Sequence, residues 1–473
     1  MSLLQNTSSK CEVSEVSEVS DSVTDVTEVT VVSSASIDDQ AFNRTNIQKN
    51  TAIKLVDTLD GLDMFCYIKE DIKNTKLVSS TRGVVFDGET CVFKGFGQTI
   101  NYSQSDLEIV ETEILPRFGE CKFYDSLEGS LIRMFNYNGK WYTTTHRKLD
   151  AFRCKWSSNE TFGNMFVKSI ESIKGIQETL SQYQGTNVFE KFKNSLNIDY
   201  QYSFLIVSNN DNRLVSIPIE GQYIVYHTGT FVNGELDMTV NCVIPTPIQH
   251  HFKNVDDIYY YVNNHVDWRD AQGVIIFAPD NVQYKIYNKQ YYEYLCVRGN
   301  EPSIKFRYLQ IRNNRSWVNS LRYLYPDMCV AFDEYENMIY EICKYIYKCY
   351  IDRFIKKMHV VTPTEEYAVI RACHSWHNED RSWNKLSLNK VCELFDNQTP
   401  SSINRMIRHL KLEKNKVEPI VSLLGSKNTG KTVYRKDTVK VEVEVEVEVE
   451  VEVEKVVDVD VDVDDDYDND NVQ

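Results

Sequence analysis

The sequence lacks three features that would place the protein in a membrane or outside the cell. No stretch of its 473 residues approaches 18 consecutive apolar side chains, so we expect no transmembrane helix. Residues 1–35 contain no apolar segment behind a basic start, and so do not form a secretory signal. The 12 cysteines are scattered without a C-x-x-C pair, which suits reduced thiols. We therefore expect a protein of the cytosol or nucleus, neither secreted nor bound to a membrane.

Charge is distributed very unevenly along the chain. The net charge is −17. Residues 1–39 carry eight acids and one lysine, a net −7, and residues 440–473 carry fifteen acids and two lysines, a net −13. This leaves +3 for residues 40–439. Low-complexity acidic segments with few large apolar side chains cannot form a core, so we expect residues 1–39 and 421–473 to be disordered tails.

The middle of the chain changes from a mixed pattern to a helical one. Residues 40–304 combine short apolar strands, turn residues and helical spacing, and residues 305–420 show helical spacing throughout. We predict strands at 77–86, 91–94, 131–135 and 140–145, and helices at 39–49 and within 160–195. The expected fold class is α+β, with antiparallel sheets and flanking helices followed by an all-helical domain.

Five short motifs follow one another in residues 60–300. They are Arg82-Gly83, then Ser126-Leu-Glu128-Gly-Ser, then Asn212-Arg213-Leu-Val, then Gln272-Gly, and finally Lys285-Ile-Tyr287. Their order and spacing resemble the bacteriophage-type RNA ligases, in the covalent nucleotidyltransferase superfamily. The resemblance implies antiparallel sheets with flanking helices. It also implies that Arg82, Arg213 and Lys285 bind a nucleotide or phosphate.

The residues that perform the chemistry of that family are replaced here. In the family a lysine at the position of Ser126 attacks the α-phosphate of ATP, and an aspartate occupies the position of Glu128. The family's sugar-binding glutamate falls on Leu205, another glutamate on Gln272, and a second lysine on Tyr287. A serine hydroxyl needs a positioned base, and no local Ser-His arrangement is visible. The resemblance thus implies no catalytic residue.

Three functions remain open. The first is a catalytically inactive, RNA-ligase-like protein that binds RNA, another nucleic acid or a protein partner. The second is an active ATP-dependent RNA ligase with a relocated lysine, for which Lys122 is the nearest candidate along the chain; only this reading requires ATP and Mg²⁺. The third is a scaffold that acts through its acidic tails. The Tyr-, Asn- and Ile-rich composition with acidic repeats also resembles the iridovirus immediate-early protein family, which implies an early regulatory protein in a host cell.

Two further motifs invite a functional reading that we do not adopt. His374 and His377 share a helical face, but two ligands without a partner pair do not make a metal site, so we expect no metal. Residues 425–432 match the P-loop expression, but a P-loop needs a following helix and a parallel sheet. Only residues 433–439 remain before the Val-Glu repeat, and we interpret the match as a coincidence.

Overall fold

The computed structural model describes residues 42–68, 76–102, 110–207, 212–217, 223–279 and 281–424, except the side chains of 102, 111, 113 and 415–424. All of them belong to one unit, Gln40–Gln473. The expected tail at 421–473 is wrong in its first four residues, which end the helix α14 Pro400–Leu424; the rest of that tail, the tail at 1–39 and the P-loop-like segment lie outside the described residues. Among the described helices, none has the length and hydropathy needed to cross a bilayer.

A four-stranded antiparallel sheet, in the order β1-β2-β3-β4, begins the described chain. The predicted strand at 77–86 is wrong in its first half, because Leu77 and Val78 belong to a short helix. The hydroxyls of Ser80 and Thr81 donate to the Leu77 carbonyl oxygen and close that turn, so extended structure starts only at Arg82. The elements of this region are α1 Arg44–Lys49, β1 Ile53–Leu59, β2 Leu62–Tyr67, α2 Lys76–Ser79, β3 Arg82–Asp87 and β4 Thr90–Phe93.

Two five-stranded sheets follow, and the chain passes from one to the other between Ser126 and Gly129. One has the order β12-β6-β13-β14-β5 and the other β11-β10-β9-β7-β8. All their pairs are antiparallel except β14 with β5. The strands are β5 Ile100–Tyr102, β6 Lys122–Ser126, β7 Gly129–Tyr137, β8 Lys140–Thr144, β9 Gln201–Val207, β10 Val225–Val232, β11 Glu235–Asp237, β12 Gln249–His250, β13 Gly273–Phe277 and β14 Gln283–Tyr287.

Helices pack around these sheets, and those expected within 160–195 are present. In α4 the side chains of Met165, Phe166 and Ile170 lie on one face and join the core. Phe166 packs against Phe204 of β9, with ring centroids 5.2 Å apart. The helical elements of this region are η2 Val110–Ile114, η3 Leu115–Glu120, η4 Ala151–Arg153, α4 Phe162–Glu171, α5 Ile176–Thr179, α6 Val188–Ser195, α7 Val255–Asn264 and α8 Lys289–Arg298.

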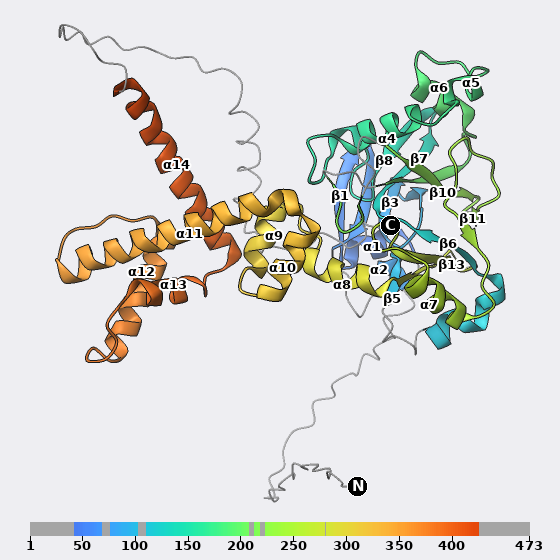
Figure 1. Cartoon of the computed structure of the whole chain (residues 1–473). Coiled ribbons are helices and arrows are strands. Elements are labelled where there is room, and N and C mark those ends of the chain that lie inside the picture. Colours follow the sequence, from blue (N-terminus) through green and yellow to red (C-terminus); the bar gives the residue numbers. More distant parts are fainter. Residues whose placement is uncertain are drawn as a thin grey trace, which may run out of the picture. The chain divides into compact units, whose positions relative to one another are not determined.

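The described residues from Ile304 to Leu424 form helices joined by short connections, as expected (Figure 1). The long helix α11 buries Ile339, Ile342 and Ile346 on one face and packs against α12, α13 and α14. The fold class, α+β with antiparallel sheets and C-terminal helices, is confirmed. One hydrophobic core runs from the β7–β9 region into these helices, so the boundary at 304 stays a prediction. The helices are α9 Ile304–Ile311, α10 Arg315–Leu324, η5 Pro326–Met328, α11 Cys329–Tyr350, η6 Ile351–Ile355, α12 Thr364–Glu379, α13 Leu388–Phe395 and α14 Pro400–Leu424.

Candidate functional site

Ser126 ends β6 and lies beside two other motifs, one at the start of β13 and one on β14 of the same sheet. The β6 and β13 strands pair so that Ser126 lies opposite Gly273, and the amide N–H of Gln272 donates to the Ser126 carbonyl oxygen at 2.7 Å. The side chains meet as well. The Ser126 hydroxyl lies 2.9 Å from Oε1 of Gln272, and Nζ of Lys285 lies 3.0 Å from the same oxygen. Three of the motif positions are thus brought together around one amide oxygen.

Tyr291, on α8, extends this group to Glu128. Its hydroxyl accepts from Nε2 of Gln272 at 2.9 Å and donates to Oε2 of Glu128 at 2.9 Å. Burial, followed by the negative charge of Glu128, raises the pKa of Tyr291 well above the ordinary value. The phenol therefore keeps its proton near neutral pH and remains the donor to the carboxylate. Sequence reasoning missed Tyr291, because one tyrosine among several in residues 287–294 carries no signal of its own.

The carboxylate of Glu128 holds a second motif in place. It accepts hydrogen bonds from the backbone N–H groups of Leu214, Val215 and Ser216, the last two at 2.8 and 2.9 Å. Together with the Tyr291 hydroxyl, these donors occupy both carboxylate oxygens of a side chain that is 2 % exposed. Glu128 thus acts as an internal anchor for the segment that follows Arg213.

The residue after Glu128 is a glycine because the neighbouring strand β9 approaches it closely. A Cβ built there would lie 2.2 Å from the carbonyl oxygen of Ile206, on the neighbouring strand β9. Real side chains do not tolerate such an approach, so β7 can pair with β9 at this point only through glycine. The glycine at position 129 is therefore required by the packing of the sheet itself, whatever the chemistry of the site.

The space beside Ser126 is nearly filled. A cavity of about 20 Å³ is lined there by Ser126, Leu127, Leu205 and neighbouring side chains. That volume accommodates about one water molecule, whereas ligand pockets generally measure about 300 Å³ or more. The leucine at the family's sugar-binding position is 2 % exposed and forms part of the wall. The side chain of Ser126 is itself buried, bonded to Gln272 and adjoining the same small cavity as Leu205.

This arrangement does not fit ATP and Mg²⁺. Magnesium is bound through carboxylates and phosphate oxygens, and Glu128 is fully engaged with protein donors. The position where the family carries its sugar-binding glutamate holds Leu205, and the position of another family glutamate holds the amide of Gln272. The amide already bonds Ser126, Lys285 and Tyr291.

The three expected phosphate-binding residues lie in different environments. Lys285 belongs to the group around Gln272. Arg213 packs against the ring of Tyr325, 4.3 Å from its centroid, and donates to the carbonyl oxygen of Leu324. Arg82 is fully buried in β3, where its Nη1 lies 3.5 Å from the carbonyl oxygen of Gly97. Lys285 and Ser126 thus bond the same oxygen of Gln272, while Arg213 bonds the C-terminal end of α10. Phosphate binding by Arg82, Arg213 and Lys285 stays a prediction.

Two further basic side chains are buried beside Arg82. Nη1 of Arg133 donates to the Arg82 carbonyl oxygen at 2.8 Å, and both residues are fully buried. Burial, together with the charge of Arg82, lowers the pKa of Arg133 to about 9. The same two causes, desolvation first, lower the pKa of His146 well below its ordinary value, so this imidazole is neutral at pH 7.

Of the remaining residues singled out from the sequence, Tyr287 adjoins this group, because its ring stacks on Tyr291 with centroids 5.8 Å apart. The others lie apart from it: Lys122 begins β6 and is exposed. His374 stacks on Phe354, while Nδ1 of His377 bonds the carbonyl oxygen of Asn384. The two histidines therefore have separate roles in holding α12.

A cluster that the sequence did not suggest brings ligand atoms of Glu365, Glu366 and His409 within 4.8 Å of one another. It is explained by ion pairs, because Arg405 bonds Glu365 at 3.3 Å and His409 bonds Glu366 at 3.2 Å. These contacts join the first turn of α12 to α14.

No family model matches the chain. Among curated proteins it is similar to the immediate-early protein ICP-46 homologue of invertebrate iridescent virus 6, with 27% identity over 73% of this chain and 80% of the relative. Its homologues are iridovirus immediate-early proteins. The homologue from invertebrate iridescent virus 3 is 25% identical over 78% of both chains. ICP-46 of frog virus 3 is 22% identical over 63% of this chain and 75% of the relative. The resemblance to this viral family is confirmed.

The similar solved structures are polynucleotide ligases. An archaeal ATP-dependent RNA ligase matches 62% of this chain and 70% of its own, with a TM-score of 0.33 and 11% identity. A putative ATP-dependent DNA ligase from Aquifex aeolicus matches 70% of this chain and 86% of its own, with the same score and identity. Both structures are ligases, as are the proteins whose motifs this sequence resembles. An identity of 11% does not indicate whether this chain is active.

Proposed function

We propose that the protein is a catalytically inactive, RNA-ligase-like viral protein that binds nucleic acid. The observation that supports inactivity most directly is the group around Gln272. A neutral amide holds both the Ser126 hydroxyl and the Lys285 ammonium, and the adjoining cavity is about 20 Å³. An activated hydroxyl needs a base that can take its proton, and an amide cannot do so. The site is therefore closed and its polar groups bond one another.

The enzyme alternative points to a different lysine from the one expected. Lys122 lies four residues before Ser126, and a strand of that length spans about 13 Å. Lys285, in contrast, shares the Gln272 oxygen with Ser126, so its amine lies next to the place where the family carries its nucleophile. If the protein forms a covalent adduct with AMP, the geometry favours Lys285 as the residue that carries it.

Two considerations support a nucleic-acid ligand over a small molecule. Residues 40–439 carry a net +3 although the whole chain is at −17, so the part with a core is the part that attracts phosphates. The relatives are named immediate-early proteins, and we extend an early regulatory role in a host cell to this chain on that ground. Binding of protein partners through the acidic tails stays a second prediction.

The decisive experiment is a test for the lysyl-AMP adduct. The full chain is incubated with α-labelled ATP and Mg²⁺, denatured, and assayed for retained label. We expect none from the wild type, because a serine occupies the position of the family's nucleophile and the neighbouring Lys285 amine bonds Gln272. Label that survives denaturation would overturn the proposal. The variants Lys285→Ala and Lys122→Ala would then identify the nucleophile, since only loss of the true one abolishes the label.

A further inference from the structure

The helical part of the chain contains an open groove of about 730 Å³ along one face of α12. We call it the α12 groove. Its lining includes Arg353, Phe354, Tyr367, Arg371, His374 and Asn378. Four of them recur on α12 at spacings of three or four residues, so they share one helical face. From Arg371 to Asn378 that face extends about 10 Å.

The basic residues of the groove are not paired with acids. Arg353 donates to the Val360 carbonyl oxygen at 3.2 Å and contacts the Tyr367 hydroxyl at 3.4 Å, while Arg371 is exposed. Within the described part of the chain neither guanidinium forms an ion pair, and no carboxylate lines the groove. The nearby acid Asp352 is already bonded to Lys356 at 2.8 Å. The groove is therefore a site of unneutralised positive charge.

Flat rings accompany this charge. His374 and Phe354 stack with centroids 3.9 Å apart and an angle of 8° between the rings. Burial, followed by electrostatic interactions with His377, Arg381 and Lys357, lowers the pKa of His374, so its ring is neutral at pH 7. The stacked pair is held in place by α12 and η6, the two elements that also carry Arg371 and Arg353.

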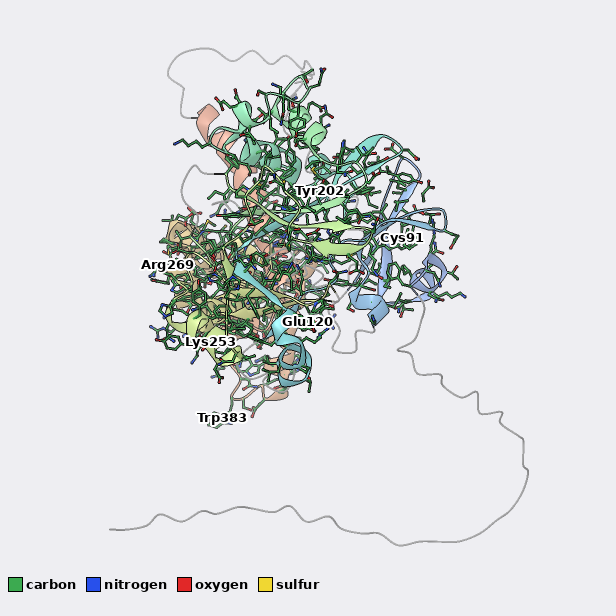
Figure 2. The ribbon with its side chains drawn as sticks, turned by 90° about the vertical axis from the view of Figure 1, so that its right-hand side faces the viewer. Cys91, Glu120, Tyr202, Lys253, Arg269 and Trp383 are labelled. Carbon is green, nitrogen blue, oxygen red and sulfur yellow. The ribbon has the colours of Figure 1, made fainter. Side chains whose placement is uncertain are left out.

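An exposed tryptophan continues the line of α12. Trp383 is 84 % exposed, although its turn is fixed by hydrogen bonds from the N–H groups of Ser382 and Trp383 to the Asp380 carboxylate, at 3.0 and 3.2 Å. Figure 2 shows it at the outer end of the loop that follows α12. Between it and the groove, Nε of Arg381 bonds Asn378 at 3.0 Å. An ordered turn that holds a large ring in water provides a surface for another ring.

We propose that the α12 groove binds single-stranded nucleic acid, with Arg371 and Arg353 contacting phosphates and Trp383 stacking on a base. Unpaired cations combined with aromatic rings are the combination that single-strand binders use. A duplex hides its base faces and would not reach Trp383. This inference rests on the proposed function and adds the location and strandedness of the nucleic-acid site.

Fluorescence anisotropy on the full chain tests the proposal, with a labelled 12-nucleotide oligouridine as the probe. We expect Arg371→Glu to weaken binding about tenfold and to flatten its salt dependence, because one phosphate contact is lost. Trp383→Ala should also weaken binding about tenfold, with the salt dependence unchanged, because stacking is not electrostatic. Arg315→Glu is the matched control: the same charge reversal at an exposed residue of α10, expected to change binding less than about twofold. A duplex of equal length should bind more weakly.

The outcomes separate this inference from the proposed function. If the wild type binds oligouridine and both groove variants bind equally well, the groove is the wrong site and the proposed function survives. If no nucleic acid binds either to the full chain or after removal of residues 440–473, both fail. If binding appears only after removal of residues 440–473 and Arg371→Glu weakens it, the acidic segment competes for the α12 groove, and the groove is still the nucleic-acid site.

Discussion

The group around Gln272 and the α12 groove both contain cations, aromatic rings and amides, but they use them in opposite ways. At the first, Ser126, Lys285 and Tyr291 bond to Gln272, and the cavity beside them is about 20 Å³. At the second, Arg371 and Trp383 are exposed beside a groove of about 730 Å³.

The difference shows why a motif alone does not locate a binding site. Polar groups that are buried must find partners inside the protein, and once they have them they contribute to stability and are lost to ligands. Polar groups at an open groove remain bonded to water, which a ligand can displace. The motif-bearing region of this chain has the first character, and α12 has the second. Three sets of substitutions test that contrast.

The largest effect is expected from Glu128→Ala. This change removes the acceptor of three backbone N–H groups and the Tyr291 hydroxyl in a buried site. We expect a loss of about 4 kcal/mol in the free energy of unfolding, measured by chemical denaturation. Glu293→Ala, an exposed residue on α8, is the control and should cost less than about 0.5 kcal/mol. A cost below about 1 kcal/mol for Glu128→Ala would contradict the role of this carboxylate as an anchor.

An intermediate effect is expected from Ser126→Lys, which restores the residue that the ligase family carries. The longer side chain must enter a cavity of about 20 Å³ and its charge would lie beside Lys285. Overpacking and repulsion between the two amines should lower the free energy of unfolding by about 2–3 kcal/mol. The same variant should still acquire no label from ATP. Adding Gln272→Glu should restore part of the lost stability, because a carboxylate would lie between the amines.

The contrast between the closed group around Gln272 and the open α12 groove would be contradicted if Ser126→Lys were as stable as the wild type and acquired label from ATP. It would mean that the space beside Ser126 opens readily and that only the nucleophile is missing. The denaturation and labelling measurements on one preparation decide between these cases.

The smallest effect is expected from Arg371→Ala and Trp383→Ala. Both side chains are exposed, and neither contributes a buried contact that its removal would leave open. The free energy of unfolding should change by less than about 0.5 kcal/mol in each variant. A loss of unfolding free energy greater than this would show that these residues stabilise α12. It would remove the contrast between the two regions.

Much of the local structure could be predicted from the sequence. The turn at Asn136–Gly139, the alternating apolar residues around it and the helical spacing after residue 304 predicted a hairpin and helices that the structure contains. The strand predicted to start at Leu77 was wrong because a short apolar run such as Leu77-Val78 suits a buried helical turn as well as a strand. Hairpins and helices depend on residues that are close together along the chain, so the periodicity of apolar residues predicts them.

The sequence by itself determined the order of the motifs and the absence of a lysine at position 126, and with it our expectation that the family's covalent route is lost. It could not show which polar groups meet. Glu128 bonds N–H groups 86 to 88 residues away, and Ser126 bonds an amide 146 residues away. Such pairs form only when two sheets and α8 pack together, since burial forces each polar group to bond whatever partner the packing provides. Tertiary structure alone therefore decided that the motif residues bond one another, and that the exposed cations and rings lie along α12.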